Sequence, residues 1–359
     1  MPRSDCAVGF RFAPCIARRP ERWRRGAQCR RDRAGVFRRF RGTGRLDRTQ
    51  RRGWIARCPR SRLAGGDRAD ARGHRLRSGK RSTRTPARLA GVTATVLQRL
   101  CARRLQDVER ARAERPLDDL VGAVRQMPMR PYERSLAEQI RAAGNEGRRA
   151  IIAELKRASP SAGLIRDELD VPGRVRAYRD GGAVGFSILT EPHEFLGSDD
   201  DLAAARETAP DRPILRKDFV IDEWQLWETR VLGADVALLI VSVLGDRLAR
   251  FLEVARDAGL EALVETHDDA ELDLALESGA ELIGINARNL HTFETSLEWV
   301  EQRIGRIPAD RIAIAESGIR GTDDMNRLAA AGARAFLIGE TLMRSDAPGE
   351  LLRTWGARA

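Results

Sequence analysis

Eight short apolar runs recur along the chain after residue 150, separated by amphipathic stretches. They follow one another at intervals of roughly 20–35 residues, the size of one β-strand with its connecting helix. The runs are Ile151–Leu155, Val184–Leu189, Ile214–Leu215, Val236–Val241, Ala262–Val264, Leu282–Ile285, Ile312–Ala315 and Ala335–Ile338. Because eight parallel strands with eight crossovers close naturally into a barrel, the pattern predicts a (β/α)8 barrel of the α/β class. A doubly wound open sheet is the alternative, but no Gly-x-Gly-x-x-Gly motif follows the first run.

Helix boundaries are also visible in the sequence. Several expected helices end in Gly-Ala, where glycine can adopt the left-handed conformation that precedes the next strand. These joints are Gly182-Ala183, Gly233-Ala234, Gly279-Ala280 and Gly332-Ala333. Three further helices are expected before the first run. They cover about Val96 to Val108, closed by Pro116; Leu117–Val124; and Ser135–Ala143, with Ser135 as N-cap and Gly144 as the stop.

Charge is distributed unevenly over the 359 residues. The formal net charge is +12, but residues 1–90 carry +22 and residues 91–359 carry −10. The basic segment contains almost only arginine, with Lys80 as its single lysine, and has no periodic apolar face. Such a segment cannot offset the entropy cost of ordering its chain. We therefore predict a disordered Arg-rich leader over residues 1–92 and a barrel domain with N-terminal helices over residues 93–359.

Three interpretations of the leader remain open. An Arg-rich arm can bind nucleic-acid phosphate, and an Arg-rich, acid-poor N-terminus is also typical of a transit peptide. A start codon assigned too early in GC-rich DNA would give the same bias toward Arg, Gly, Ala and Pro. We favour the last interpretation, because the chain from residue 93 onward looks complete without the leader.

Other sequence features limit the setting of the protein. There is no run of about 18 apolar residues, so no transmembrane helix is expected, and the N-terminus lacks the apolar core of a secretory signal. Four of the five cysteines lie in the leader, no Cys-x-x-Cys pair occurs, and the four histidines are far apart. These patterns support neither a zinc site nor a disulfide framework, and they favour a reducing cytoplasm.

The first apolar run ends in charge. Side chains alternate along a strand, so Ile152, Glu154 and Lys156 share one face. A buried carboxylate and a buried ammonium are costly unless they are paired or used. The Ser-Pro-Ser loop that follows, beginning at Ser159, is the kind of segment found at the catalytic rim of a barrel. A structural ion pair at a strand end is the alternative interpretation.

Most of the other runs also end in polar residues. In chain order these are Thr190-Glu191, Arg216-Lys217-Asp218-Phe219, Glu265, Asn286 with Arg288, Glu316-Ser317-Gly318 and Gly339-Glu340. Active sites of such barrels lie at the C-terminal ends of the strands, so these groups are expected on one rim.

Such a rim could bind an anionic substrate and transfer protons to or from it, because it carries lysines, glutamates, an asparagine and an arginine. The turns at Ser317-Gly318 and Gly339-Glu340 follow the last two strands, where barrels bind phosphate through backbone N–H groups. Ordinary turn chemistry is the alternative for these glycines. Phe195 and Phe219 could be walls for an aromatic ring, but the residues alone favour a place in the core.

Five segments in order resemble indole-3-glycerol phosphate synthase. They are residues 151–161 (Ile-Ile-Ala-Glu-Leu-Lys-Arg-Ala-Ser-Pro-Ser), 215–219 (Leu-Arg-Lys-Asp-Phe), 284–290 (Gly-Ile-Asn-Ala-Arg-Asn-Leu), 315–319 (Ala-Glu-Ser-Gly-Ile) and 338–343 (Ile-Gly-Glu-Thr-Leu-Met). The resemblance covers about residues 93–359. It implies a carboxy-lyase of tryptophan biosynthesis that needs no cofactor or metal. The implied reaction converts 1-(2-carboxyphenylamino)-1-deoxyribulose 5-phosphate to indole-3-glycerol phosphate, CO2 and water.

The resemblance also implies roles for individual residues. Lys217 matches the general acid, Glu265 the acid/base of the dehydration, and Lys156 the lysine that binds the substrate carboxylate and can share the acid role. Glu154 and Asn286 match groups that orient these side chains. The implied substrate-binding residues are Ser159, Ser317, Gly318, Gly339 and Glu340 near the phosphate, Phe195, Phe219 and Leu238 around the aromatic ring, Arg288 near the carboxylate, and Glu316.

Two departures and two alternative functions accompany the resemblance. Ala162 stands where many members have lysine, and the leader has no counterpart in the family. No isomerase barrel follows Ala359, so the fused bifunctional form is not expected.

Phosphoribosylanthranilate isomerase is the alternative enzyme, but its chemistry needs a cysteine near the end of the first strand, which this chain lacks. A nucleic-acid-binding protein with an inactive barrel is the other alternative, and the full set of rim residues argues against it.

The expected partner is therefore one small phosphorylated substrate. We expect no nucleic-acid or membrane partner for the barrel, and a monomer or weak homodimer.

Deleting residues 1–92 should leave activity and thermal stability unchanged, because a segment without an apolar face buries little against a barrel. Charge attraction between leader and barrel should be screened near physiological ionic strength. Turnover and melting temperature of the two chain lengths check this, with mass spectrometry of the native N-terminus. An intact leader whose removal lowers the melting temperature by several degrees would contradict the proposed boundary.

Overall fold

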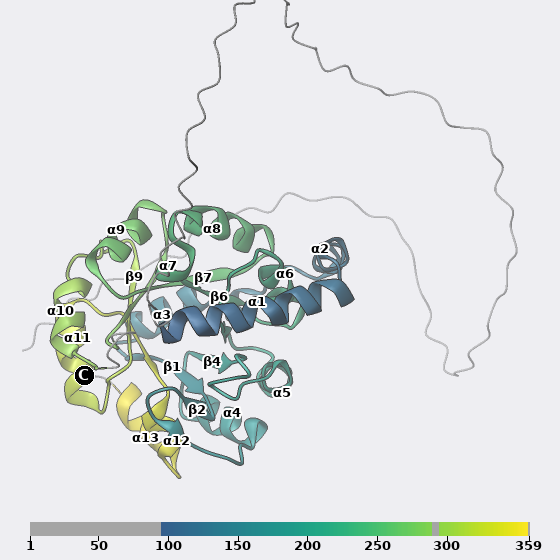
Figure 1. The fold of residues 1–359 in the computed structure, drawn as a ribbon. Helices are drawn as coiled ribbons and strands as arrows, with labels where there is room; N and C mark the ends of the chain where they lie inside the picture. The colour runs from purple at the N-terminus through teal and green to yellow at the C-terminus, as the bar shows by residue number, and fades with distance from the viewer. Residues whose placement is uncertain (1–94, 289–293, 358–359) are drawn as a thin grey trace, which may run out of the picture. The chain divides into compact units, whose positions relative to one another are not determined.

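The computed structural model describes residues 95–288 and 294–357. Eight parallel strands form a closed barrel in the order β1-β10-β9-β8-β7-β6-β5-β4 (Figure 1). The strands are β1 Ala150–Leu155, β4 Gly185–Leu189, β5 Ile214–Lys217, β6 Val236–Ile240, β7 Glu261–Thr266, β8 Leu282–Asn286, β9 Ile312–Glu316 and β10 Ala335–Ile338. Each of the eight predicted runs coincides with one of these strands, so the predicted (β/α)8 barrel is confirmed.

Helices follow the strands around the outside of the barrel (Figure 1). They are α4 Val171–Asp180, α5 Asp199–Thr208, α6 Trp224–Val231, α7 Val241–Leu244, η2 Gly245–Arg247, α8 Leu248–Asp257, α9 Asp269–Glu277, α10 Leu297–Ile304, α11 Thr322–Ala331, α12 Glu340–Arg344 and α13 Pro348–Gly356. The four predicted glycine joints all have left-handed backbone, with φ of 89° at Gly182, 94° at Gly233, 77° at Gly279 and 116° at Gly332. Glycine is therefore required where these helices turn into the next strand.

Between residue 95 and β1 the structure has four helical elements: α1 Val96–Glu114, α2 Leu117–Gln126, η1 Tyr132–Arg134 and α3 Leu136–Asn145. Ser135 caps α3 as predicted, since its side chain accepts a hydrogen bond from the Glu138 N–H. The predicted stop at Gly144 is wrong. The helix continues through Asn145, and the left-handed residue is Gly147, with φ of 69°.

The predicted leader, residues 1–92, lies outside the described residues, so its extent and its disorder stay predictions. A small antiparallel hairpin of β2 Ala158–Ser159 and β3 Gly163–Leu164 was not expected. Its strands have two residues each, too short for any alternation to be read from the sequence.

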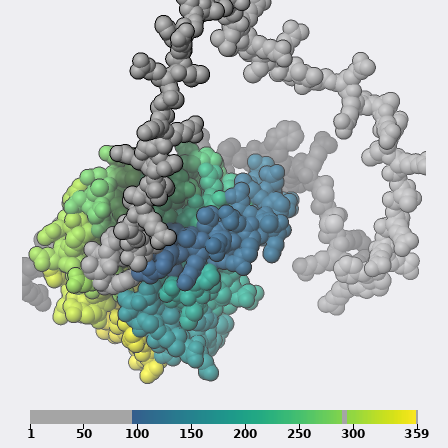
Figure 2. Space-filling view, viewed as in Figure 1, coloured from purple at the N-terminus to yellow at the C-terminus, as the bar shows by residue number. Residues whose placement is uncertain are grey.

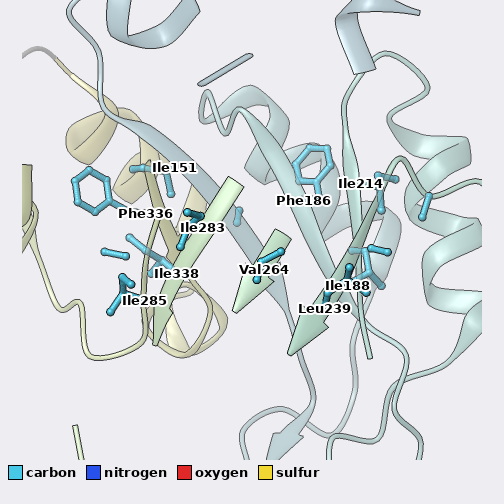
Figure 3. Close-up of a cluster of buried hydrophobic side chains, with 14 of the residues drawn as sticks. Ile151, Phe186, Ile188, Ile214, Leu239, Val264, Ile283, Ile285, Phe336 and Ile338 are labelled. Carbon is cyan, nitrogen blue, oxygen red and sulfur yellow. The ribbon is translucent and has the colours of Figure 1, made fainter. Parts of the chain in front are cut away.

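The barrel has two apolar cores because strand side chains alternate between its two faces. Ile151, Phe186, Val264, Ile283 and Phe336 belong to the core on the outer face, under the helices (Figure 3). The inner core contains the intervening residues, which include Ile152, Leu215, Leu238, Leu263, Leu282, Ile314 and Leu337. The strands are therefore buried on both faces, as is usual for a parallel sheet.

Helix α3 closes one end of the inner core. Its buried residues Leu136, Ala137, Ile140 and Ala143 join the same cluster as Ala150, at the start of β1. The inner layers are thus sealed at the N-terminal ends of the strands, and the opposite end is available for a site.

Among residues 95–288 and 294–357, no helix is long and apolar enough to cross a bilayer.

Ile140→Ala should destabilise the fold by about 2–5 kcal/mol, because it leaves a cavity under the barrel floor. Ile140 is 2% exposed. Urea unfolding of the full chain measures the change, and Leu105→Ala in α1, where the side chain is 46% exposed, is the control. A loss no larger than that of the control would contradict the role of α3 as a plug.

Candidate active site

The inner face of the barrel changes from apolar to charged at the C-terminal ends of the strands. Lys217 follows Leu215 on β5, Glu265 follows Leu263 on β7, and each pair is spaced by two residues. The same two-residue spacing separates Ile152 from Glu154 on β1 and Ile314 from Glu316 on β9. Because side chains two apart share a face, strand geometry alone directs these charges into the top of the barrel.

The charged end of the barrel opens into a cavity of about 780 Å³. All fifteen predicted site residues line it. They are Glu154, Lys156, Ser159, Phe195, Lys217, Phe219, Leu238, Glu265, Asn286, Arg288, Glu316, Ser317, Gly318, Gly339 and Glu340. These residues come from β1, β4, β5, β6, β7, β8, β9 and β10 or from the segments that follow them.

Lys217 lies between two carboxylates. Its Nζ donates to Glu265 Oε2 at 2.5 Å and to Glu316 Oε2 at 2.7 Å. Burial lowers the pKa of Lys217, but the attraction of Glu265 and Glu316 outweighs it and raises that pKa above its ordinary value of 10.5. The amine is therefore an ammonium at neutral pH, and it faces the cavity with a proton to donate.

A second ion pair forms beside the first. Lys156 Nζ lies 2.8 Å from Glu154 Oε1, as the alternation on β1 predicted. The hydroxyl of Ser187, which is fully buried, donates to the other oxygen of Glu154 at 3.4 Å. A Cβ at Gly339 would lie 2.3 Å from Glu154 Oε1 and 3.0 Å from Lys156 Nζ. Glycine is thus required for this pair to sit against the end of β10.

The turn after β9 has strained backbone. Ser317 has a φ of 66° and Gly318 a φ of 73°, so two consecutive residues are left-handed. A non-glycine residue in this region costs about 1–3 kcal/mol and is typical of functional sites. The conformation exposes the turn to the cavity beside Gly339, where the sequence predicted phosphate contacts.

The apolar wall of the cavity combines barrel and N-terminal residues. The rings of Phe195 and Phe219 are 6.2 Å apart and tilted by 47°, and both are only partly buried. Both line the cavity, against the interpretation based on residues alone, although Phe219 also packs against the inner core. Helix α1 adds Val96, Leu97 and Leu100. Figure 2 shows α1, in blue, as a ridge across this face of the molecule.

Ion pairs hold α1 over the cavity. Arg104 forms a bidentate pair with Asp218, with Nε–Oδ1 at 2.8 Å and Nη2–Oδ2 at 2.7 Å. Asp218 is the residue after Lys217 and is 2% exposed. Asp107 on the same helix lies 2.9 Å from His193 Nε2, in the segment that carries Phe195. The N-terminal helix is therefore tied to two segments that build the site.

Three of the polar strand-end residues do not line the cavity: Thr190, Glu191 and Arg216. The hydroxyl of Thr190 donates to Asp218 Oδ2 at 2.8 Å. Arg216 points to the outer face of β5, where it pairs with Glu228 of α6 at 2.7 Å. Glu191 accepts hydrogen bonds from the N–H groups of His193, Glu194 and Phe195 and so shapes the turn after β4. All three serve the structure around the site.

Sequence reasoning missed the place of His267 and Ser187 in the site, and the position of the predicted helix α1 over the cavity. His267 Nε2 lies 3.1 Å from Glu265 Oε1. It follows Glu265 by two residues, so strand alternation could have found it, and the same spacing relates Ser187 to Leu189 on β4. Nothing in the sequence places α1 over the cavity, because that depends on tertiary contacts. Among the described residues no group of three or more His, Cys, Asp or Glu side chains is arranged to hold a metal ion.

Glu316→Gln should make stability less dependent on pH. Burial raises the pKa of Glu316 from 4.5 to about 8, so between these values the folded state holds a proton that the unfolded state has lost. Stability is then greatest at low pH and falls as pH rises toward 8. His267, whose pKa is raised from 6.5 to about 9 mainly by its carboxylate partners against the effect of burial, adds a slope of the same sign.

Urea unfolding at pH 6 and pH 8.5 checks this, with the exposed Glu350→Gln as control. The slope should be shallower in Glu316→Gln and unchanged in the control. Equal slopes in all three proteins would show that Glu316 is ionised at neutral pH.

Comparison with known proteins identifies the family. The family model of indole-3-glycerol phosphate synthase matches residues 97–354. An indole-3-glycerol phosphate synthase of Acetivibrio thermocellus is 47% identical over 59% of this chain and 82% of its own length. One of Azospirillum brasilense is 44% identical over 70% and 95%, and one of Laribacter hongkongensis 43% identical over 72% and 97%. The chain therefore belongs to the indole-3-glycerol phosphate synthase family, the carboxy-lyases of tryptophan biosynthesis.

Proposed function

We propose that the cavity closes the indole ring of 1-(2-carboxyphenylamino)-1-deoxyribulose 5-phosphate, with loss of CO2 and water, through the residues named above. The observation that carries this proposal is the partly buried Lys217 ammonium, held at 2.5 and 2.7 Å by Glu265 and Glu316 in a cavity that also contains Lys156. A cation of this kind can bind an anion and give up a proton in the same place.

The use of lysine supports the proposal. The chain has only three lysines, Lys80, Lys156 and Lys217, and all its other basic side chains besides histidine are arginine. Both lysines within the described residues line the cavity. Arginine stays protonated in proteins, whereas lysine can transfer its proton. The two positions with lysine are therefore those where the proposed reaction needs an acid.

In the proposed mechanism Lys217 protonates the substrate carbonyl while the ring carbon attacks it, so a C–C bond forms and the carbonyl becomes a hydroxyl. The C–CO2 bond then breaks, CO2 leaves, and its electron pair neutralises the iminium formed on attack. Loss of the hydroxyl as water, with removal of one ring proton, completes the indole. Glu265 takes part in this dehydration, and Glu154 and Asn286 orient the two lysines and Glu265.

The substrate's remaining groups have matching surfaces. Lys156 and Arg288 suit the carboxylate that is lost, and Phe195, Phe219 and Leu238 suit the aromatic ring. The turns at Ser317-Gly318 and Gly339-Glu340, with Ser159, suit the phosphate. Glu340 is negative, but Arg344 lies 3.0 Å from it and offsets its charge.

We further propose that the protein works in the cytoplasm, without a cofactor, as a monomer or weak homodimer. The free thiol of Cys101 is compatible with a reducing compartment. All residues of the proposed site come from one chain, so assembly is not needed to complete it. Light scattering across a concentration series tests the oligomeric state.

Incubating the full chain with the carboxyphenylamino substrate and recording indole fluorescence tests the reaction. Growth of the indole signal with release of CO2 is the expected result. Turnover of phosphoribosylanthranilate in its place, or no turnover of either compound by folded protein, would overturn the proposal.

Lys217→Ala should lower kcat by about 10²–10⁴-fold, as expected for loss of a general acid. Lys217→Arg is the matched variant, because it keeps the charge but cannot donate the proton at neutral pH. Steady-state kinetics of both variants separate proton transfer from charge. If Lys217→Ala kept more than about half of the wild-type kcat, the acid role would be wrong.

A further inference from the structure

Two carboxylates share one ammonium, but their surroundings differ. Lys217 Nζ lies 2.5 Å from Glu265 and 2.7 Å from Glu316, so distance to the lysine hardly distinguishes them. Two negative carboxylates this close to each other and to a single cation repel each other. One of the two carboxyl groups therefore tends to keep its proton. Which one keeps it must then be decided by their other neighbours.

Glu265 has two further polar neighbours. Its Oε1 accepts from Asn286 Nδ2 at 3.2 Å. The same oxygen lies 3.1 Å from His267 Nε2, a contact with the distance of an ion pair but without the geometry of a hydrogen bond. The ring of His267 has a second carboxylate on its far side, since Nδ1 is 3.3 Å from Glu271 Oε2. The backbone N–H of His267 also donates to that oxygen, at 2.7 Å. An imidazole between two carboxylates is stabilised as a cation.

Glu316 has no comparable support. It is 1% exposed, and its Oε1 is buried without a hydrogen-bond partner in the described part of the chain. The oxygen lies against Gly284, where an added Cβ would be only 2.0 Å away. A carboxylate oxygen in such a place is poorly solvated, which favours the neutral acid.

We propose that His267 is a positioning residue that makes Glu265 the ionised member and Glu316 the protonated member of the carboxylate pair on Lys217. The cationic imidazole contacts Glu265 and not Glu316. It therefore stabilises the state with the proton on Glu316 over the state with the proton on Glu265. The proposal rests on the function given above, because it concerns the protonation of the same site.

Other charged groups around the pair do not supply this asymmetry. From β1, Glu154 acts on Lys217 but is itself paired with Lys156 at 2.8 Å. The directions of the pKa values agree with the proposal. Burial raises the pKa of Glu265, but Lys217 and His267 reverse this and hold it well below 4.5. Burial raises that of Glu316 to about 8, and the pKa of His267 is raised to about 9.

The asymmetry gives the two glutamates different chemical tasks. An ionised Glu265 can accept a proton from the substrate during the dehydration, whereas a protonated Glu316 cannot compete for that proton. It also leaves Lys217 with one full negative partner, so the site around the lysine is close to neutral before an anionic substrate enters.

The pH profile of kcat/KM for His267→Gln tests the proposal in the full chain. Glutamine keeps an N–H donor near Glu265 but carries no charge, so the pKa of Glu265 should rise. Activity needs ionised Glu265, so the acid limb of the kcat/KM profile should lie at higher pH in His267→Gln than in the wild type.

Two control variants sharpen this test. Glu271→Gln leaves every group in the cavity unchanged but weakens the cation on His267, so it should shift the acid limb in the same direction by less. His193→Gln replaces the histidine that pairs with Asp107 and should leave the acid limb in place. A His267→Gln profile that superimposes on wild type would overturn the proposal, even if its melting temperature were lower.

A measurement independent of turnover uses nitrogen-15 NMR of labelled histidine. By linkage, Glu265→Gln should lower the pKa of His267 toward 6.5, while Glu316→Gln should change it little. Equal effects of the two variants, or no effect of either, would overturn the proposal. Failure of the wild-type protein to turn over its substrate would instead count against the proposed function, and this titration would still test the role of His267.

Discussion

The site depends on holding the partly buried ammonium of Lys217 between the side chains of Glu265 and Glu316 at the end of the barrel. A buried charge is costly unless it is paired and hydrogen-bonded, and Lys217 reaches Glu265 and Glu316 at 2.5 and 2.7 Å. Glu265 lies on β7, two strands along the sheet from β5, and Glu316 lies on β9, four strands along it. Both side chains reach Lys217 because the sheet curls into a barrel, which links the fold to the assembly of the site.

The remaining structure holds this arrangement in place. Helix α3 fills the N-terminal end of the inner core, and α1 covers the other end through the pair between Arg104 and Asp218. Asp218 follows Lys217 directly, so the contact that holds α1 also fixes the end of the strand that carries the lysine. Helices α1 and α3 thus pack at the two ends of the inner core and form one structure with the barrel.

Much of this was predictable because it depends on local rules. Periodic apolar runs predicted all eight strands, and alternation of side chains predicted that Glu154 and Lys156 would point the same way. The position of α1 and the hairpin at residues 158–164 were not predicted, because they follow from tertiary contacts or very short segments. The outward direction of Arg216 was overlooked, although alternation on β5 places it on the face opposite Leu215 and Lys217. His267 was missed for another reason: one histidine after a strand is usually unremarkable, and its meaning depends on the distance to Glu265.

The most direct test of this account is NMR of the full chain with isotopically labelled lysine, since only three lysines give signals. The account predicts that Lys217 remains an ammonium beyond pH 10.5. It also predicts that adding indole-3-glycerol phosphate moves the signals of Lys156 and Lys217 but not that of Lys80. A Lys217 signal that titrates at or below pH 10.5, or that ignores the added product, would contradict the central claim that this buried ammonium is the acid of the site.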